Sequence, residues 1–233
     1  MNQEDDIIQR MASLGTVAAS LAHEIKNPLV SIKTLAQLLP EKYDDPEFRD
    51  YFTRIVLDEV ERINTLVSEL LDFARSSEPR MELLGLEDLI EEVLKRLSVR
   101  MIQGDIRMKK EFSSPRPTLY GDPVQLKQAL LNIMVNGIES MPLGGELGVR
   151  VFRQGTEVVI VLSDTGCGIP AEDLLRIFEP FYTTKPSGTG LGLAICKKVV
   201  EEHGGKIHVT SRNQEGTVFT LSLPAAEGSE GQP

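Results

Sequence analysis

The chain has 233 residues, of which 41% are hydrophobic, and its 25 basic and 35 acidic side chains give a net charge of −10. This acidic balance argues against a nucleic-acid backbone as partner, and 5% aromatic residues without tryptophan leave few surfaces on which bases could stack. The apolar runs are too short to cross a bilayer, the acidic start lacks the basic region of a signal peptide, and the two cysteines are too few for a disulfide framework. These features indicate a cytoplasmic globular protein.

Residues 5–39 are predicted to form one long helix, because apolar side chains recur at gaps that alternate between four and three. The seam comprises Ile7, Met11, Leu14, Ala18, Leu21, Ile25, Pro28, Ile32, Leu35 and Leu39. His23 falls between two seam positions on the outer face, and Asn27 lies one turn further along that face. Pro28 has no N–H to offer the carbonyl of Glu24, so we expect a kink just after His23.

A second helix is predicted over residues 47–75, after a break at Pro40 and the stretch Tyr43–Pro46. Its apolar set is Phe52, Val56, Val60, Ile63, Val67, Leu70 and Ala74. An antiparallel pair of such helices has too little interior to bury both seams. Pairing of two copies into a four-helix bundle solves this, and packing against the chain's own second domain is the alternative.

The polar stretch Ser76–Pro79 is the predicted domain boundary, and mixed α/β patterns follow it. Helices are expected at residues 86–97, from the Asp122 cap to 141, and at 193–203, where Gly204 and Gly205 end the last one. Strands are expected at residues 105–112, 148–152, 157–163, 206–211 and 217–223. The polar tail 225–233 is expected to be disordered. The predicted division is therefore a hairpin (1–76), an α/β domain (77–224) and a tail.

Polar side chains recur at every fourth position of the helix that Asp122 caps. They are Gln128, Asn132, Asn136 and Ser140, on an otherwise apolar helix. Asparagine is a mediocre helix former, so two on one face call for a reason. Their neutral oxygens suit Mg²⁺, which keeps most of its coordination for water and phosphate. A solvated polar face is the alternative.

Two glycine-containing segments complete the pattern. The buried strand Val158–Asp164 ends in an acid and precedes Gly166, Gly168 and Ile169, whose backbone can approach a ligand closely. The segment Phe178–Lys185 leads into a glycine cluster that opens a helix, where backbone N–H groups can meet phosphate. The cluster comprises Gly188, Thr189, Gly190, Leu191, Gly192 and Leu193. It is not a P-loop, because it lacks Gly-Lys-Ser/Thr. It is not a dinucleotide fingerprint either, because no strand precedes it and the glycine spacing differs.

Together these motifs resemble, in order, the five boxes of the sensor histidine kinases of two-component systems. The string His23-Glu24-Ile25-Lys26-Asn27-Pro28-Leu29 is similar to the H-box of that family. The resemblance implies that His23 is the phosphoacceptor and that Glu24 holds or deprotonates its other ring nitrogen. It also implies that Asn27 serves the opposite activity, dephosphorylation of the partner regulator.

The resemblance also assigns the nucleotide contacts. Asn136 would be the Mg²⁺ ligand, with Asn132 and Gln128 beside it, Asp164 would accept from the adenine amino group, and Lys185 would reach the terminal phosphate. The implied set further includes Gly166, Gly168, Ile169, Phe178, Thr217 and the cluster from Gly188 to Leu193. One departure from the family is Gly137, where alanine is more usual. His203 and His208 are interpreted as structural.

The implied fold is α + α/β, a helical hairpin forming a dimeric four-helix bundle followed by a Bergerat-type (GHKL) α/β sandwich that binds ATP. The implied function is autophosphorylation of His23 by Mg²⁺-ATP and transfer to an aspartate of a response regulator receiver domain. No sensor domain, membrane segment or receiver domain is recognised. The chain is therefore expected to be the catalytic core, either of a longer protein, which could be membrane-anchored, or of a small soluble kinase that acts with a partner. The rival is a GHKL-type conformational ATPase or a scaffold without kinase activity. Against it stands the hairpin with His-Glu-x-x-Asn-Pro, which those ATPases lack.

Overall fold

The computed structural model describes residues 24–74, 79–113, 116–185 and 188–226. The chain divides into two compact units, one formed by residues 1–75 with 180–191 and the other by 76–179 with 192–233. Within the described ranges, no helix combines the length and the apolar character needed to span a lipid bilayer.

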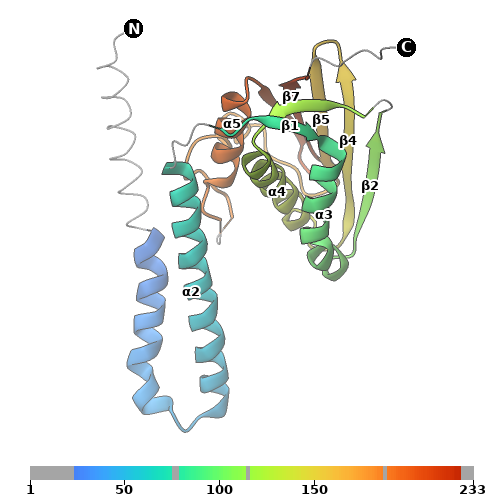
Figure 1. Cartoon of the computed structure of the whole chain (residues 1–233). Helices are drawn as coiled ribbons and strands as arrows, with labels where there is room; N and C mark the ends of the chain where they lie inside the picture. Colours follow the sequence, from blue (N-terminus) through green and yellow to red (C-terminus); the bar gives the residue numbers. More distant parts are fainter. Residues whose placement is uncertain (1–23, 75–78, 114–115, 186–187, 227–233) are drawn as a thin grey trace. The chain divides into compact units, whose positions relative to one another are not determined.

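The first unit contains the predicted helical hairpin. Residues 24–42 are helical, and α2 (Pro46–Ala74) runs beside them after a short turn (Figure 1). The Asp45 carboxylate caps α2 by accepting bonds from the backbone N–H groups of Glu47 at 3.0 Å and Phe48 at 3.3 Å. The hairpin prediction is thus confirmed for the described residues, while residues 5–23 of the first helix lie outside them.

The end of the first helix differs from the prediction. The helix continues through Pro40 to Lys42 instead of ending at Leu39. Proline removes one bond to the carbonyl of Ala36, which a helix tolerates more easily in its last turn than in its middle. The seam itself behaves as expected, because its described members are buried or half-buried while most neighbouring positions are exposed. They are Ile25, Pro28, Ile32, Leu35 and Leu39.

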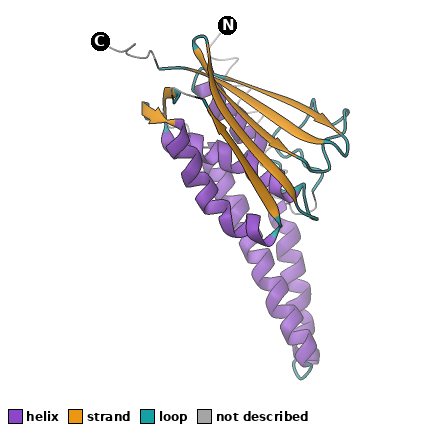
Figure 2. Ribbon diagram, turned by 90° about the vertical axis from the view of Figure 1, so that its right-hand side faces the viewer, coloured by secondary structure: helices purple, strands orange, loops and turns teal. Residues whose placement is uncertain are grey.

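The second unit is built on a five-stranded sheet with helices on one face (Figures 1 and 2). The strand order is β2-β4-β5-β7-β6, and only the β2–β4 pair is parallel. The strands of this sheet are β2 (Ile106–Phe112), β4 (Gly145–Gln154), β5 (Glu157–Asp164), β6 (Lys206–Arg212) and β7 (Gly216–Pro224). The helices are α3 (Leu86–Gln103), α4 (Pro123–Glu139) and α5 (Gly192–Glu202). The α/β sandwich predicted from the sequence is confirmed.

The core lies between the sheet and the three helices. The apolar stripe of α4 buries Leu126, Leu130 and Met134 to 2% exposure or less. From the sheet, Ile160, Leu162 and Leu221 are each 1% exposed. Such burial stabilises the fold by roughly 1.5–3 kcal/mol for each large apolar side chain. This layer fixes α4 against β5 and so positions the polar residues at its edge.

Three expectations for this unit need correction. The sequence did not predict the two-stranded sheet of β1 (Glu82–Gly85) and β3 (Thr118–Gly121), whose four-residue strands are too short for a periodic signal. Helix α3 runs to Gln103, beyond the predicted end at residue 97, because Gly104 is its cap. Ala225 and Ala226, expected in the disordered tail, are hydrogen-bonded to Thr156 and Thr118, and the rest of the tail lies outside the described residues.

A buried network joins the start of α4 to the end of α5. Asp122 caps α4 by accepting bonds from the backbone N–H groups of Val124 (2.9 Å) and Gln125 (3.1 Å), and its other oxygen accepts from Arg80 N–H (3.0 Å). The Asp122 N–H donates to His203 Nε2 at 2.9 Å, and His203 Nδ1 lies 2.7 Å from the Val199 carbonyl, which fits a neutral ring protonated on Nδ1. His203 is therefore structural, as its position in the sequence suggested.

Replacement of Asp122 by alanine is expected to lower the free energy of unfolding by about 2 kcal/mol at neutral pH. Burial acts to raise the pKa of the Asp122 carboxyl, but the N–H donors of Arg80, Gln125 and Val124 outweigh it and the pKa is lowered. A carboxyl with a lowered pKa stabilises the fold above its unfolded-state pKa and loses this effect as the pH falls through the folded-state value.

The difference in stability between wild type and Asp122→Ala should therefore shrink in acid. Urea denaturation at neutral and acidic pH measures it, and Asp122→Asn, which keeps the capping oxygen, is the matched control with a smaller loss. A loss that is the same at both pH values would contradict the role of the charge.

Candidate active site

The polar stripe of α4 is half-buried rather than solvated. Gln128 Nε2 donates to Asn132 Oδ1 at 3.2 Å, and Asn132 Nδ2 donates to the carbonyl of Gly192 at 3.2 Å. Asn132 therefore connects α4 to the first residue of α5. Asn136 lies one turn further along the same face and is also half-buried. The structure thus brings Gln128, Asn132 and Gly192 together, while their contact with a nucleotide stays a prediction.

Asp164, at the end of β5, is 9% exposed and lies beside the end of α4. Its Oδ1 accepts bonds from the Gly166 N–H at 2.9 Å and from the Ser140 hydroxyl at 3.2 Å. A Cβ at Gly166 would lie 1.8 Å from Ser140 Oγ, so only glycine fits at this position. The carboxylate is consequently held in a fixed position by α4 and by the turn that follows β5.

The next part of the turn is fixed to β6 and β7. The Ile169 N–H donates to Ser211 Oγ at 2.8 Å, and this hydroxyl lies 3.0 Å from Thr217 Oγ1. Gly168 has a φ of +70° and no room for a Cβ, which would lie 2.0 Å from the Arg212 carbonyl. Thr217 is 4% exposed and is the register partner of Asp164. Asp164, Gly166, Gly168, Ile169 and Thr217 are thus gathered at one end of the sheet.

The remaining cluster positions, apart from those in α5, belong to the first unit. The Thr189 hydroxyl accepts from the Leu191 N–H at 3.3 Å, and the Gly188 N–H donates to the Lys185 carbonyl at 3.1 Å. Gly190 has a φ of +68°, and its carbonyl accepts from the Phe181 N–H at 3.0 Å. Helix α5 then begins at Gly192 and includes Leu193, as the glycine cluster predicted.

Phe178 belongs to the second unit and makes a contact with α5. Lys197 Nζ lies 6.0 Å from the centre of the Phe178 ring, within the range of a cation–π interaction. The position therefore anchors the segment before the glycine cluster, which is a structural role beside the one that the resemblance implies.

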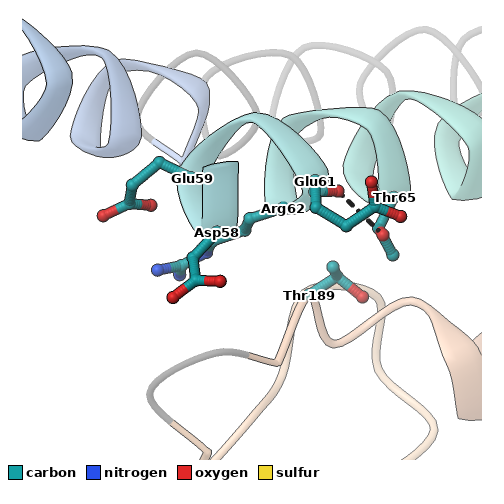
Figure 3. A pocket seen from close by; sticks show the side chains of 6 residues that line it. All are labelled: Asp58, Glu59, Glu61, Arg62, Thr65 and Thr189. Carbon is teal, nitrogen blue, oxygen red and sulfur yellow. Dashed lines mark hydrogen bonds between the residues drawn. The ribbon is translucent and has the colours of Figure 1, made fainter. Parts of the chain in front are cut away.

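An open pocket of about 400 Å³ lies within the first unit (Figure 3). It is lined by Asp58, Glu59, Glu61, Arg62, Thr65 and Thr189. Three of these side chains are acidic and one is basic, a balance that disfavours a polyphosphate anion. This pocket is therefore not the nucleotide site, and the Asp164 region remains the better candidate.

The H-box is described only in part. His23 lies outside the described residues, whereas Glu24 is half-buried, Asn27 is exposed and Pro28 is buried. The exposure of Asn27 agrees with its predicted place on the outer face of the helix. The kink at Pro28 stays a prediction.

The sequence analysis did not single out Ser211, and it named Ser140 only as a member of the polar stripe. Ser140 was the last member of the α4 stripe, so its spacing was a usable signal. Ser211 alternates with exposed residues on an edge strand and carried no signal.

The two cysteines are free, as expected: Cys167 is exposed, while burial raises the pKa of the Cys196 thiol to about 12 and makes it an inert core residue.

Comparison with known families identifies both parts of the chain. Residues 13–79 match the family described as the His Kinase A (phospho-acceptor) domain. Residues 121–227 match the family described as histidine kinase-, DNA gyrase B- and HSP90-like ATPases. The second match implies that the α/β unit binds ATP.

Curated relatives match over nearly the whole chain. Sporulation kinase D of Bacillus subtilis is 37% identical over 227 residues, which are 97% of this chain and 45% of that protein. The sensor histidine kinase ZraS of Escherichia coli is 37% identical over 216 residues, which are 93% of this chain and 46% of that protein. The chain thus spans about half the length of these relatives.

Solved structures give the same result. Histidine kinase ThkA, solved in complex with the response regulator protein TrrA, is 30% identical, with a TM-score of 0.83 over 96% of this chain and 65% of that one. The separate catalytic domain of ThkA is 33% identical, with a TM-score of 0.58 over 62% of this chain and 95% of that one. With both family matches in this order, the chain belongs to the histidine kinases and contains the catalytic core of that family.

Proposed function

We propose that the chain transfers the γ-phosphoryl group of Mg²⁺-ATP to His23 and then to an aspartate of a response regulator receiver domain. The observation that carries this proposal is the combination of two motifs in one chain. The described part of the string His23–Leu29, from Glu24 onward, is helical, and Asn27 is exposed on it. The second unit holds a buried Asp164 at the edge of a GHKL sandwich. The ThkA relative was solved in complex with a response regulator protein, TrrA, which supports a partner of the same kind here.

In the proposed reaction, a neutral ring nitrogen of His23 attacks the γ-phosphorus, the bond to the bridging oxygen breaks, and ADP leaves. The unperturbed pKa of histidine, near 6.5, leaves this nitrogen largely neutral at cytoplasmic pH. Glu24, the next residue, would hold or take the proton of the other ring nitrogen. A carboxylate of the receiver domain then attacks the phosphohistidine and frees the imidazole. ATP as phosphoryl donor makes the cytoplasm the expected location.

The residues of α4 fit a magnesium ion that is held mainly by phosphate. In the described part of the chain, no group of three or more His, Cys, Asp or Glu side chains forms a metal site. Mg²⁺ needs only one or two protein oxygens when substrate phosphates supply the others. The half-buried Asn136 amide is such an oxygen, and Lys185 would add a positive charge beside the terminal phosphate. The ion would neutralise the charge that develops during phosphoryl transfer.

The chain is further proposed to act as a homodimer. Apolar side chains on one face of α2 remain exposed at gaps of three, seven and four residues, which fits a heptad seam. They are Leu57 (64% exposed), Val60 (43%), Val67 (40%) and Leu71 (57%). A second copy that covers this seam would complete the four-helix bundle.

Incubation with γ-labelled ATP and Mg²⁺ tests the proposed function. We expect label on the protein that is lost in acid and retained in alkali, because the phosphorus–nitrogen bond of phosphohistidine is acid-labile. A purified regulator added afterwards should take up the label. Tight ATP binding without any labelling would instead favour a conformational ATPase or a scaffold.

Replacement of Asn27 by alanine should separate two activities. The exposed amide can hold a water by hydrogen bonds but cannot act as a nucleophile or strong base. Hydrolysis of a regulator aspartyl phosphate needs such a water, and loss of its positioning can cost about a hundredfold in rate. Phosphorylation of His23 needs no water. The variant should therefore keep autophosphorylation and lose regulator dephosphorylation.

Both rates are measured on one preparation, with Gln37→Ala, an exposed amide two to three turns along the same helix, as control. If dephosphorylation in Asn27→Ala equals that of the wild type, Asn27 is only a surface residue.

A further inference from the structure

We propose that Ser140 positions the Asp164 carboxylate for the nucleobase and thereby determines how strongly the site selects purines with an exocyclic amino group. The proposal rests on the proposed ATP function and assigns part of its selectivity to a residue to which the family resemblance gave no role. Ser140 is a positioning residue, because it would act through Asp164 and not by touching the nucleotide.

Ser140 lies where α4 meets the turn after β5. It is the C-cap of α4, and its backbone N–H bonds to the carbonyls of Asn136 and Gly137. Its own carbonyl accepts from the Cys167 N–H at 3.1 Å, which fixes the turn to the end of the helix. All these bonds are made by the backbone and do not require a serine side chain. The hydroxyl is therefore available for a separate purpose.

The hydroxyl lies between two acceptors. Ser140 Oγ is 2.7 Å from the Gly137 carbonyl and 3.2 Å from Asp164 Oδ1. A hydroxyl carries one proton, and both neighbours can only accept it when the carboxylate is ionised. An ionised acceptor binds a donor more strongly than a neutral carbonyl does. The single proton is therefore shared between the Gly137 carbonyl, which is the nearer acceptor, and the Asp164 carboxylate.

The two oxygens of Asp164 have different surroundings. Oδ1 accepts from the Gly166 N–H and from Ser140, so two donors on one side fix the plane of the carboxylate. Oδ2 faces the backbone of Gly137, because a Cβ built on Gly137 would lie 3.6 Å from Oδ2 and 3.4 Å from Asp164 Cβ. With Oδ1 held, the plane of the carboxylate is fixed, and in the proposal Oδ2 is the oxygen that would accept from an adenine amino group.

Removal of the hydroxyl should take away one of the donors that hold Oδ1 and let the carboxylate rotate more easily about its last bond. The fold should not suffer, because alanine is a better helix former than serine and the backbone cap is unchanged. The cost should fall on the bond from the amino group to Asp164 and not on the phosphates. A contact of this strength corresponds to about a fivefold change in affinity.

Calorimetric titration of wild type, Ser140→Ala and Ser98→Ala with two nucleotides tests this proposal. The nucleotides are ATP and purine riboside triphosphate, which is ATP without the exocyclic amino group. Ser98 is the matched control: its hydroxyl also donates to the carbonyl three residues earlier, at 2.8 Å, but it lies on an exposed surface. Ser140→Ala should bind ATP about fivefold more weakly and the amino-free analogue as wild type does, whereas Ser98→Ala should bind both normally.

Asp164→Ala, measured in parallel, separates this proposal from the function on which it rests. It should abolish the preference for ATP over the analogue. If Asp164→Ala does so while Ser140→Ala leaves the preference unchanged, or weakens both nucleotides equally, Ser140 has no positioning role and the ATP site stands. If Asp164→Ala leaves the preference unchanged, the adenine contact itself is wrong and this proposal falls with it.

Discussion

Replacement of His23 by glutamine is expected to abolish autophosphorylation and to leave the affinity for Mg²⁺-ATP within a few-fold of the wild type. Glutamine keeps a polar side chain of similar size but offers no nucleophilic nitrogen, so the first phosphoryl transfer cannot occur. The affinity should survive because the two family matches, residues 13–79 and 121–227, place the phosphoacceptor and the nucleotide site in separate domains. Labelling with γ-labelled ATP and calorimetric titration of the same preparation measure both quantities.

The chain offers a matched control for this experiment. His208 is an exposed histidine on the edge strand β6, and His208→Gln makes the same chemical change away from the H-box. This control should be labelled as strongly as the wild type. Acid-labile label on His23→Gln would show that another residue is the phosphoacceptor.

Replacement of Asn136 by alanine is expected to remove the Mg²⁺-dependent part of ATP binding. Loss of residues that merely orient a metal ligand costs roughly ten- to a hundredfold in affinity, so loss of the ligand itself should cost about a hundredfold. The fold should persist, because alanine is the better helix former and the side chain is only half-buried. Titrations with ATP in Mg²⁺ and in chelator give the metal-dependent difference directly.

Gln103→Ala, at an exposed position in the last turn of α3, is the control for loss of an amide side chain from a helix. It should bind Mg²⁺-ATP as the wild type does. Equal Mg²⁺-dependent affinity in Asn136→Ala and wild type would remove Asn136 from the site and leave the α4 stripe without a metal ligand.

The fold could be predicted where its signals are local. Asp122 and Pro123 mark the start of α4 because a side-chain cap and a proline at the first turn act within three residues. The end of α3 could not be predicted from periodicity, since Val99 and Ile102 are 62% and 80% exposed and the apolar stripe ends before the helix does. Strands β1 and β3 depend on each other, and neither is recognisable alone.

In the candidate site, too, only the features with a local sequence signal could be predicted. Asp164 was recognisable because a buried strand that ends in an acid before glycines is a local pattern. The partners that hold the site are distant in sequence: Ser140 is 24 residues from Asp164, and Ser211 is 42 residues from Ile169. Such pairs arise from the register of β5, β6 and β7 and from the docking of α4, which no single segment encodes.

The central claim is tested most directly by locating the phosphoryl group. After incubation with Mg²⁺-ATP, the protein is digested with trypsin at alkaline pH, and the peptide that ends at Lys26 is fragmented by mass spectrometry. This peptide begins after Arg10 and contains Ser13, Thr16 and Ser20 beside His23, so the hydroxyl side chains serve as internal alternatives. We expect the phosphoryl group on His23 and its loss after brief acid treatment. Acid-stable phosphate on a hydroxyl side chain, or an unmodified peptide from protein that binds Mg²⁺-ATP, would contradict the assignment of this chain as a kinase that phosphorylates His23.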